Sequence, residues 1–215
     1  MSDYLNATLA CDGKHFFIEG PAGQLESMAS CVSGSQKPSI VIICHPHPQH
    51  GGSMQNKVVH TLDKSFQKLG ASTLRFNFRS VGESEGEYAD AIGEVDDLAA
   101  IIAWVERLKP GHEIYLAGFS FGAYIVMQSL QAFNPSQVVI VAPPVDMFDF
   151  SQVSSPNCPC LLIQGESDEI VDSEQVQRWA QSLEGINSVL VPDCGHFFHG
   201  KLNILQSVLV DNLQI

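Results

Sequence analysis

The feature of this sequence that most restricts its fold is an alternation of short apolar, β-branched runs with longer segments of helical periodicity. The runs cover residues 39–47, 72–78, 113–117, 138–144, 160–165 and 188–193, and the helical segments cover 54–70, 91–111, 121–133, 173–183 and 200–213. Short strands that are apolar throughout are typical of a parallel sheet buried on both faces. Two further strands, around HFFIEG (15–20) and QLESMASCV (24–32), are expected to be antiparallel. We predict an α/β fold, a mainly parallel, doubly wound sheet of about 7–8 strands with helices on both faces.

Composition supports one folded unit and excludes two classes of partner. The chain has 215 residues, of which 45% are hydrophobic and 16% charged, and a single domain spanning 1–215 is expected. Its 24 acidic and 11 basic residues give a net charge of −13. Phosphate backbones and anionic lipid headgroups would repel such a chain, so we expect no nucleic-acid or membrane partner. Without a signal peptide or a long apolar run, a cytoplasmic location is expected.

The cysteines and histidines do not form a familiar metal motif. Six cysteines are scattered along the chain without C-x-x-C spacing, and we expect reduced, mostly buried thiols. His45, His47 and His50 lie close together, but prolines stiffen the segment and no Asp, Glu or Cys accompanies them. We therefore predict neither a metal nor a cofactor.

The pentapeptide GFSFG (118–122) matches G-x-S-x-G and has the context that a nucleophile elbow requires. The predicted strand EIYLA (113–117) leads directly into it, and a predicted helix begins at about Phe121. The turn strains the backbone and demands small neighbours, which Gly118 and Gly122 provide. Ser120 is therefore the candidate nucleophile, and the alternative is a serine that only caps a glycine-rich helix start.

A serine nucleophile needs a base and an orienting acid. His196 follows the last predicted strand and is the candidate base, with His199 as the competitor at the start of the final helix. Asp168 follows the strand at 160–165 and is the candidate acid. Asp146, after the strand at 138–144, is the alternative acid. Other acidic residues have other expected roles: Asp172 is expected to cap the helix at 173–183, and Asp193 to be a loop residue.

An oxyanion hole needs two backbone N–H groups. The residue after the nucleophile, Phe121, can supply one. The loop HPHPQHGGSM (45–54) can supply the other, and His47 is the best-placed donor because Pro46 and Pro48 have no N–H.

With these pieces in place, the chain resembles the α/β-hydrolase superfamily, and within it the small, lidless bacterial group related to dienelactone hydrolase-like esterases. The similarity runs nearly end to end. It rests on IEGPAGQLE (18–26), HPHPQHGGSMQNKVV (45–59), LRFNFRSVGESEGEY (74–88), GFSFGAYI (118–125), GESDEIV (165–171) and CGHFFHGKL (194–202). The resemblance implies nucleophile, acid and base roles for Ser120, Asp168 and His196, and oxyanion donors at His47 and Phe121.

Two departures from that group concern the site. Ser80 stands where the group usually has glycine, which should alter the loop beside the site. Dienelactone hydrolases proper use a cysteine nucleophile, so a serine argues against that substrate. Asn77, Arg79 and Glu83 are interpreted as polar residues that brace the same loop.

The segment PVDMFDFSQVSSPNC (144–158) is too short for a helical lid. An open, shallow pocket rimmed by Met147, Phe148 and Phe150 is expected, with Met147 and Phe148 as candidate substrate contacts.

We therefore predict a serine hydrolase that cleaves short-chain carboxylic esters, a small-molecule substrate, through an acyl-enzyme. The alternatives are a thioesterase, peptidase or acyl transferase on the same triad, or a binding protein that does not use it. The apolar final helix, with Leu202, Leu205, Val208 and Leu209, can support a homodimer.

Overall fold

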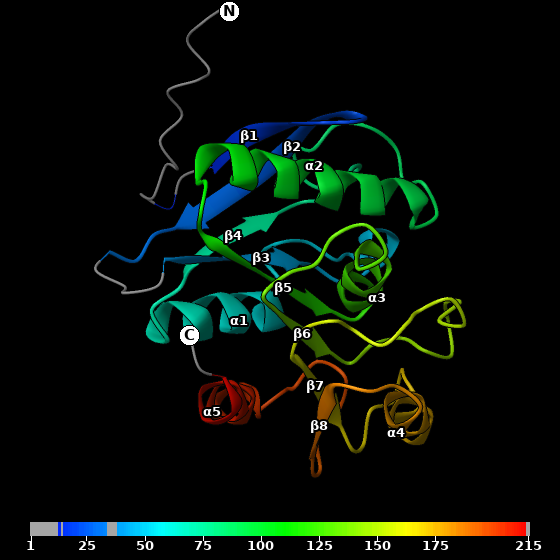
Figure 1. The fold of residues 1–215 in the computed structure, drawn as a ribbon. Coiled ribbons are helices and arrows are strands. Elements are labelled where there is room, and N and C mark those ends of the chain that lie inside the picture. The colour runs from blue at the N-terminus through cyan, green and yellow to red at the C-terminus, as the bar shows by residue number, and fades with distance from the viewer. Residues whose placement is uncertain (1–12, 14, 34–37, 214–215) are drawn as a thin grey trace, which may run out of the picture.

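The computed structural model describes residues 13, 15–33 and 38–213 and places them around one eight-stranded sheet (Figure 1). The strand order is β1-β2-β4-β3-β5-β6-β7-β8. The strands are β1 (His15–Gly20), β2 (Gly23–Ser30), β3 (Ser39–Cys44), β4 (Ser72–Phe76), β5 (Glu113–Phe119), β6 (Gln137–Val141), β7 (Cys160–Gly165) and β8 (Ile186–Val191). β1 pairs antiparallel with β2, and β2 pairs antiparallel with β4. Strands β3 to β8 run parallel to one another. The predicted mainly parallel α/β sheet is confirmed.

Helices cover both faces of this sheet. They are α1 (Lys57–Lys68), α2 (Ile92–Leu108), α3 (Phe121–Ser129), α4 (Ser173–Gln181) and α5 (Leu202–Asn212). In Figure 1, α1 and α5 lie together on one face, and α2, α3 and α4 lie on the other. Side chains alternate between the two cores along each strand: in β3, Ile40 and Ile42 pack with α2 and α3, whereas Val41 and Ile43 pack with α1. Burial on both faces explains why the central strands β3, β6 and β7 are almost entirely apolar.

Helix and strand ends follow local chemistry. The Asn56 side chain accepts the N–H of Val58 at the start of α1, and Gly70, just past its end, has φ of +96°. The Asp172 carboxylate accepts the N–H groups of Glu174 and Gln175, so its predicted capping role is confirmed. The last strand was expected at 188–193 but spans Ile186–Val191, because Pro192 ends its pairing with β7.

Two further expectations can be compared with the described residues. Between β6 and β7 the chain forms only turns and bends, with no helical lid. Cys44, Cys158, Cys160 and Cys194 are free thiols, but Cys31 is disulfide-bonded, so the expectation that all the cysteines are reduced was wrong there. Cys11 lies outside the described residues. Among the helices described, none combines the length and hydrophobicity needed for a bilayer span.

Candidate active site

Ser120 sits on a sharp turn between β5, which ends at Phe119, and α3, which begins at Phe121. Its backbone has φ of +54° and ψ of −119°, a conformation that non-glycine residues rarely adopt. Close packing explains the flanking glycines. A Cβ on Gly118 would lie 2.3 Å from the carbonyl oxygen of Gly122, and one on Gly122 would lie 2.4 Å from that of Cys44. The Ser120 N–H donates to the Val141 carbonyl at 2.8 Å, which fixes the turn against β6.

Three of the predicted site residues form one hydrogen-bonded chain. Ser120 Oγ lies 3.1 Å from His196 Nε2, and His196 Nδ1 lies 2.8 Å from Asp168 Oδ2. The His196 and Asp168 side chains are only 3% and 0% exposed, whereas Ser120 is half-buried. The chain therefore runs from a buried carboxylate, through a buried imidazole, to an accessible hydroxyl.

The Asp168 carboxylate is held by more than the imidazole. Its Oδ1 accepts the backbone N–H groups of Ile170 and Val171, and its Oδ2 also accepts from Gln164 Nε2 at 2.9 Å. Burial raises the pKa of Asp168. The hydrogen bond and charge of His196, together with the two backbone N–H groups, lower it by a larger amount, so the pKa lies below its ordinary value. Asp168 is therefore a carboxylate, and the imidazole donates Nδ1–H to it.

None of the alternative acids or bases joins this chain. Asp146 and Asp193 are both exposed: the Asp146 carboxylate accepts the N–H of Asp172, at 3.5 Å, and the backbone N–H of Asp193 donates to Glu166. His199 is exposed and meets the Phe197 ring edge-on, with ring centroids 5.7 Å apart. The Asp172 carboxylate is used by its helix cap.

Two residues that support the chain were not identified from the sequence. Gln164, at the end of β7, donates to Asp168. Glu169 Oε2 accepts the backbone N–H of His196 at 3.1 Å. In the sequence, only its position next to Asp168 could have pointed to Glu169.

The segment after β3 (45–56, the β3 loop) contains His45 and His47 in different environments. His45 is completely buried: its Nε2 accepts the Phe78 N–H, so its Nδ1–H donates to the Pro46 carbonyl. Burial lowers the pKa of His45 to about 4. Both ring nitrogens of His45 are thus engaged within the protein, which leaves no lone pair for a metal.

The two predicted oxyanion donors come from two different segments of the chain. His47 precedes a 3-10 turn at Pro48–His50, and Phe121 is the first residue of α3. Within the described part of the chain, neither the N–H of His47 nor that of Phe121 has a hydrogen-bond acceptor. The His47 ring packs 4.9 Å from the Phe121 ring, so the two residues are in contact.

Aromatic side chains surround the His47 ring. The Tyr88 hydroxyl lies 3.4 Å from His47 Nε2, and the Phe148 ring lies 6.1 Å from the His47 ring. Burial, and then the charge of His50, lower the pKa of His47, which favours a neutral ring. Tyr88 reaches the β3 loop from the segment between β4 and α2, and its contact with His47 was not identified from the sequence.

The three residues predicted to rim the pocket differ in exposure. Met147 is 53% exposed and Phe148 is half-buried beside Tyr124, with ring centroids 4.8 Å apart. Phe150 is buried, against Tyr124 and Trp179, so its assignment to the rim was wrong. Apolar contact with α3 and α4 draws this side chain into the core.

Polar residues brace the segment that follows β4. Asn77 donates to Glu26 Oε2 and accepts the Met54 N–H, which joins this segment to β2 and to the β3 loop. Arg79 forms a buried ion pair with Asp97 at 2.7 Å. The predicted bracing roles of Asn77 and Arg79 are confirmed, and that of Glu83 involves its backbone N–H, which donates to Glu26.

Ser80 has φ of +67°, in the left-handed region that favours glycine. The departure from the group's usual glycine therefore strains the backbone of this loop.

One group of side chains has the composition of a metal site. Donor atoms of His15, Glu26 and Glu83 lie within 4.8 Å of one another. Glu26 Oε2 already accepts from Asn77 and Glu83, and Oε1 contacts His15 Nδ1, so its lone pairs are engaged. We derive no metal chemistry from this group.

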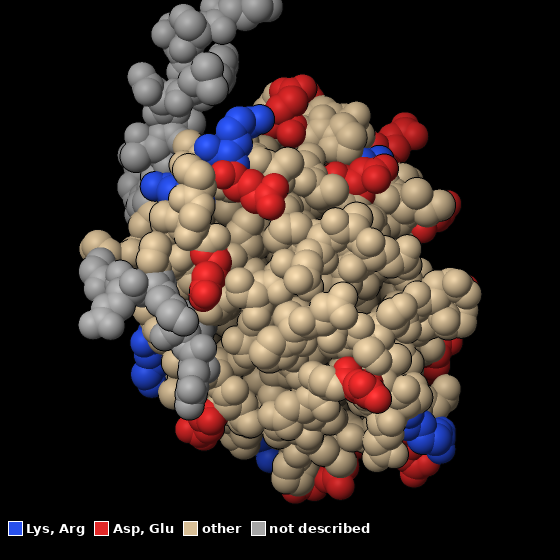
Figure 2. All heavy atoms as spheres, in the orientation of Figure 1, with Lys and Arg blue, Asp and Glu red and all other residues tan. Residues whose placement is uncertain are grey.

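Charges and cavities are unevenly distributed. In the face shown in Figure 2, acidic side chains outnumber basic ones, in keeping with the net charge.

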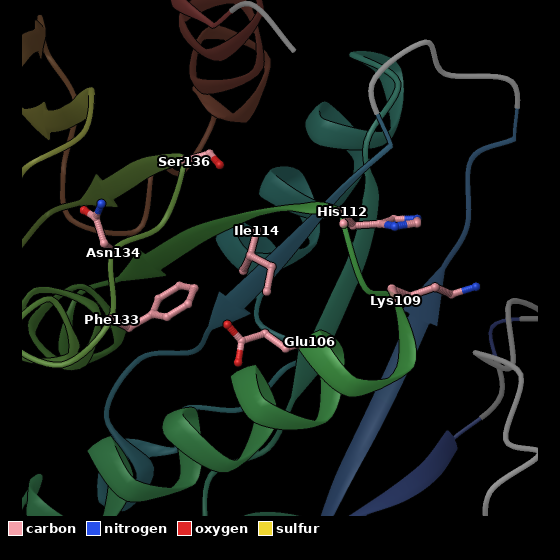
Figure 3. Close-up of a pocket in the computed structure, with 8 residues that line it drawn as sticks. Glu106, Lys109, His112, Ile114, Phe133, Asn134 and Ser136 are labelled. Atoms are coloured by element: carbon pink, nitrogen blue, oxygen red, sulfur yellow. The ribbon is translucent and has the colours of Figure 1, made fainter.

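A cavity of about 340 Å³ lies at the amino ends of β5 and β6, where Glu106 projects towards Ile114 and Phe133 while Lys109 and His112 point away (Figure 3). It lies at the opposite end of the parallel strands from Ser120, and it is therefore separate from the candidate active site.

Comparison with known proteins agrees with the fold. Residues 39–152 match the family model for the alpha/beta hydrolase fold. The chain belongs to this family, and within it to a small lidless group of alpha/beta serine hydrolases.

Three similar proteins illustrate this membership. An alpha-beta serine hydrolase homologue from Coxiella burnetii is 45% identical, with a TM-score of 0.90 over 93% of this chain and 97% of that one. An a/b serine hydrolase without a lid from Xanthomonas campestris is 40% identical, with a TM-score of 0.85 over 91% of each chain. An uncharacterized protein of Rickettsia prowazekii (strain Madrid E) is 32% identical in an alignment that covers 92% of this chain and 87% of that protein.

Proposed function

We propose that this protein hydrolyses short-chain carboxylic esters with Ser120 as nucleophile, His196 as base and Asp168 as orienting acid. The observation that carries the proposal is the hydrogen-bonded chain Ser120–His196–Asp168, with spacings of 3.1 and 2.8 Å. A serine hydroxyl is a weak nucleophile near neutral pH, and this arrangement supplies the proton acceptor that it needs.

In the first half of the reaction, Ser120 Oγ bonds to the acyl carbon and its proton passes to His196 Nε2. The carbonyl oxygen, which now carries the negative charge, accepts hydrogen bonds from the backbone N–H groups of His47 and Phe121, which have no other acceptor among the described residues. The bond to the alcohol oxygen then breaks, and that oxygen takes the proton from His196. Asp168 stabilises the imidazolium while it exists, because its carboxylate is charged and hydrogen-bonded to Nδ1.

In the second half, water attacks the acyl-enzyme. Its proton passes to His196 Nε2, the bond to Ser120 Oγ breaks, and the proton returns to Ser120. A carboxylic acid leaves, and no co-reactant other than water is consumed.

The acyl group is expected to be small. Met147 and Phe148 are proposed to contact it, because neither side chain is buried and the segment between β6 and β7 forms no helical lid. Tyr88 adds an aromatic edge to the same side through its contact with His47.

A panel of matched acetyl compounds tests the reaction class. Nitrophenyl acetate, a thioacetate and an acetanilide are compared for wild type and Ser120→Ala. Ester turnover that disappears in Ser120→Ala supports the proposal. Preference for the thioester or the anilide would instead indicate a thioesterase or an amidase, and no turnover of any compound would favour a binding protein.

A further inference from the structure

A second cavity lies against the candidate active site and differs from its surroundings in charge. It has a volume of about 440 Å³, and its lining includes Ser53, Asn56, Lys57, Phe197, His199 and Leu202. One wall comes from the β3 loop and the start of α1. The other comes from the segment between β8 and α5 (192–201, the His196 loop).

The Phe197 ring connects this cavity to His196. The Phe197 ring meets the His196 ring edge-on, with centroids 5.1 Å apart, and the His199 ring meets Phe197 in the same way at 5.7 Å. The opposite wall belongs to the β3 loop, in which the His47 carbonyl accepts the N–H groups of His50 and Gly52. A group bound here would lie against Phe197, whose ring contacts His196, and beside the loop that carries His47.

The position beside His196 assigns this cavity to one half of the substrate. His196 must deliver its proton to the departing alcohol oxygen, so the alcohol half of an ester leaves on the side of the base. The Met147 and Phe148 rim is then left for the acyl half.

The charge of the cavity is the reverse of the protein's average. The chain has 24 acidic and 11 basic residues, yet the lining of this cavity includes Lys57 and His199 and no Asp or Glu. Lys57 is exposed and forms no ion pair with any described residue, and the first turn of α1 contains no acidic residue. A cation at the start of a helix is electrostatically unfavourable, so helix stability does not explain this lysine.

The hollow beside Asp168 has the opposite character. It has a volume of about 620 Å³ and is lined by five carboxylate residues, namely Asp146, Asp168, Glu169, Asp172 and Glu174. A negatively charged group would be repelled from that hollow and attracted to the Lys57 cavity.

We propose that the cavity bounded by Lys57, Phe197 and His199 binds the alcohol half of the ester and selects alcohols that carry an anionic group, a carboxylate or a phosphate. Lys57 supplies the charge, His199 a ring N–H donor, and Phe197 an apolar surface for the body of the leaving group. This inference rests on the proposed esterase reaction and adds the class of substrate to it.

The test compares three acetyl esters that differ only in one substituent: 3-acetoxybenzoate, 3-acetoxybenzamide and 3-acetoxyphenyl phosphate. The kcat/KM of each anionic ester is divided by that of the neutral ester, 3-acetoxybenzamide. Effects of a substitution on acetyl transfer itself then cancel in the ratio. Lys57→Ala is expected to lower this ratio by about threefold to tenfold, the range for a partly exposed charged contact. The anionic ester that loses more identifies the preferred group.

Lys64→Ala is the matched control. It removes the same charge from an exposed position two turns further along α1, about 10 Å away, and should leave the ratio unchanged. An equal ratio in wild type, Lys57→Ala and Lys64→Ala, with the amide ester still hydrolysed, would overturn the anion site while the esterase proposal stands.

Direct binding separates the two proposals if no ester is hydrolysed. Backbone NMR signals of the wild type are followed while 3-hydroxybenzoate, or 3-hydroxybenzamide as the neutral control, is added. If the signals of Lys57 and His199 shift with 3-hydroxybenzoate but not with 3-hydroxybenzamide, the anion site is supported even if the esterase proposal fails. Shifts confined to other regions, or no shifts, would overturn it.

Discussion

Glu169 Oε2 accepts the backbone N–H of His196 at 3.1 Å, while its neighbour Asp168 accepts the imidazole Nδ1–H of the same residue at 2.8 Å. Two consecutive carboxylates thus hold one histidine by its main chain and by its ring. Proton transfer needs the imidazole within hydrogen-bond reach of Ser120, so the main-chain contact should matter as well as the ring contact.

Removing the Glu169 carboxylate should reduce turnover more than substrate binding. Glu169→Ala leaves the His196 N–H without its acceptor, and kcat for nitrophenyl acetate should fall about threefold to tenfold with little change in KM. Glu169→Gln keeps an accepting oxygen and should recover most of the rate. Equal kcat for wild type and Glu169→Ala would show that the contact does not position His196.

Acyl chain length should not improve catalysis beyond short chains. A closed acyl tunnel would gain about 0.8 kcal/mol per buried methylene, roughly fourfold in kcat/KM, whereas an open rim gains little. We expect kcat/KM for nitrophenyl esters to level off or fall beyond butyrate. A steady rise from butyrate to decanoate would contradict the open-rim account.

Ser80→Gly should stabilise the protein. A left-handed backbone costs a non-glycine residue about 1 kcal/mol, part of which is offset by the greater freedom of glycine in the unfolded chain. The free energy of unfolding in urea should rise by about 0.5 kcal/mol. Ser207→Gly, at an exposed site within α5, should lower it by a similar amount, and a loss of stability in both variants would refute the strain at Ser80.

His45 should make stability fall in mild acid. Its folded pKa is about 4, whereas an unfolded histidine titrates near 6.5. Between these values the unfolded chain binds a proton that the folded chain does not. The free energy of unfolding should therefore decrease by up to about 1.4 kcal/mol for each unit that pH falls.

Urea unfolding between about pH 4.5 and pH 6.5 measures this slope, which should be smaller in His45→Asn. Nitrogen NMR of the wild-type ring gives a second readout that needs no variant. A charged His45 ring at about pH 5.5 in folded protein would contradict the assigned hydrogen bonds.

The alternation of strands and helices predicted the fold because burial on both faces makes the central strands apolar. The same topology explains why Ser120, Asp168 and His196 could be proposed from sequence: each follows the carboxyl end of a parallel strand, and those ends meet at one edge of the sheet. The strand partners and the site geometry came from the structure.

Contacts between loops could not be predicted from the sequence in this way. Tyr88 reaches His47 across the site, and Glu169 reaches the main chain of His196, but neither contact has a periodic pattern. Phe150 was misplaced for the same reason, since an aromatic residue in a connection can face solvent or turn into the core. The cavity at Lys57 and His199 joins segments that are far apart in the chain, so only the structure brings them together.

Labelling by a fluorophosphonate probe, followed by mass spectrometry of the modified peptide, tests the central proposal most directly. The account predicts one adduct on Ser120 in folded protein, lost in His196→Ala and retained in Asp172→Ala, whose carboxylate serves only the cap of α4. Absence of an adduct on Ser120 in folded wild-type protein, or undiminished labelling in His196→Ala, would contradict the proposed nucleophile and its base.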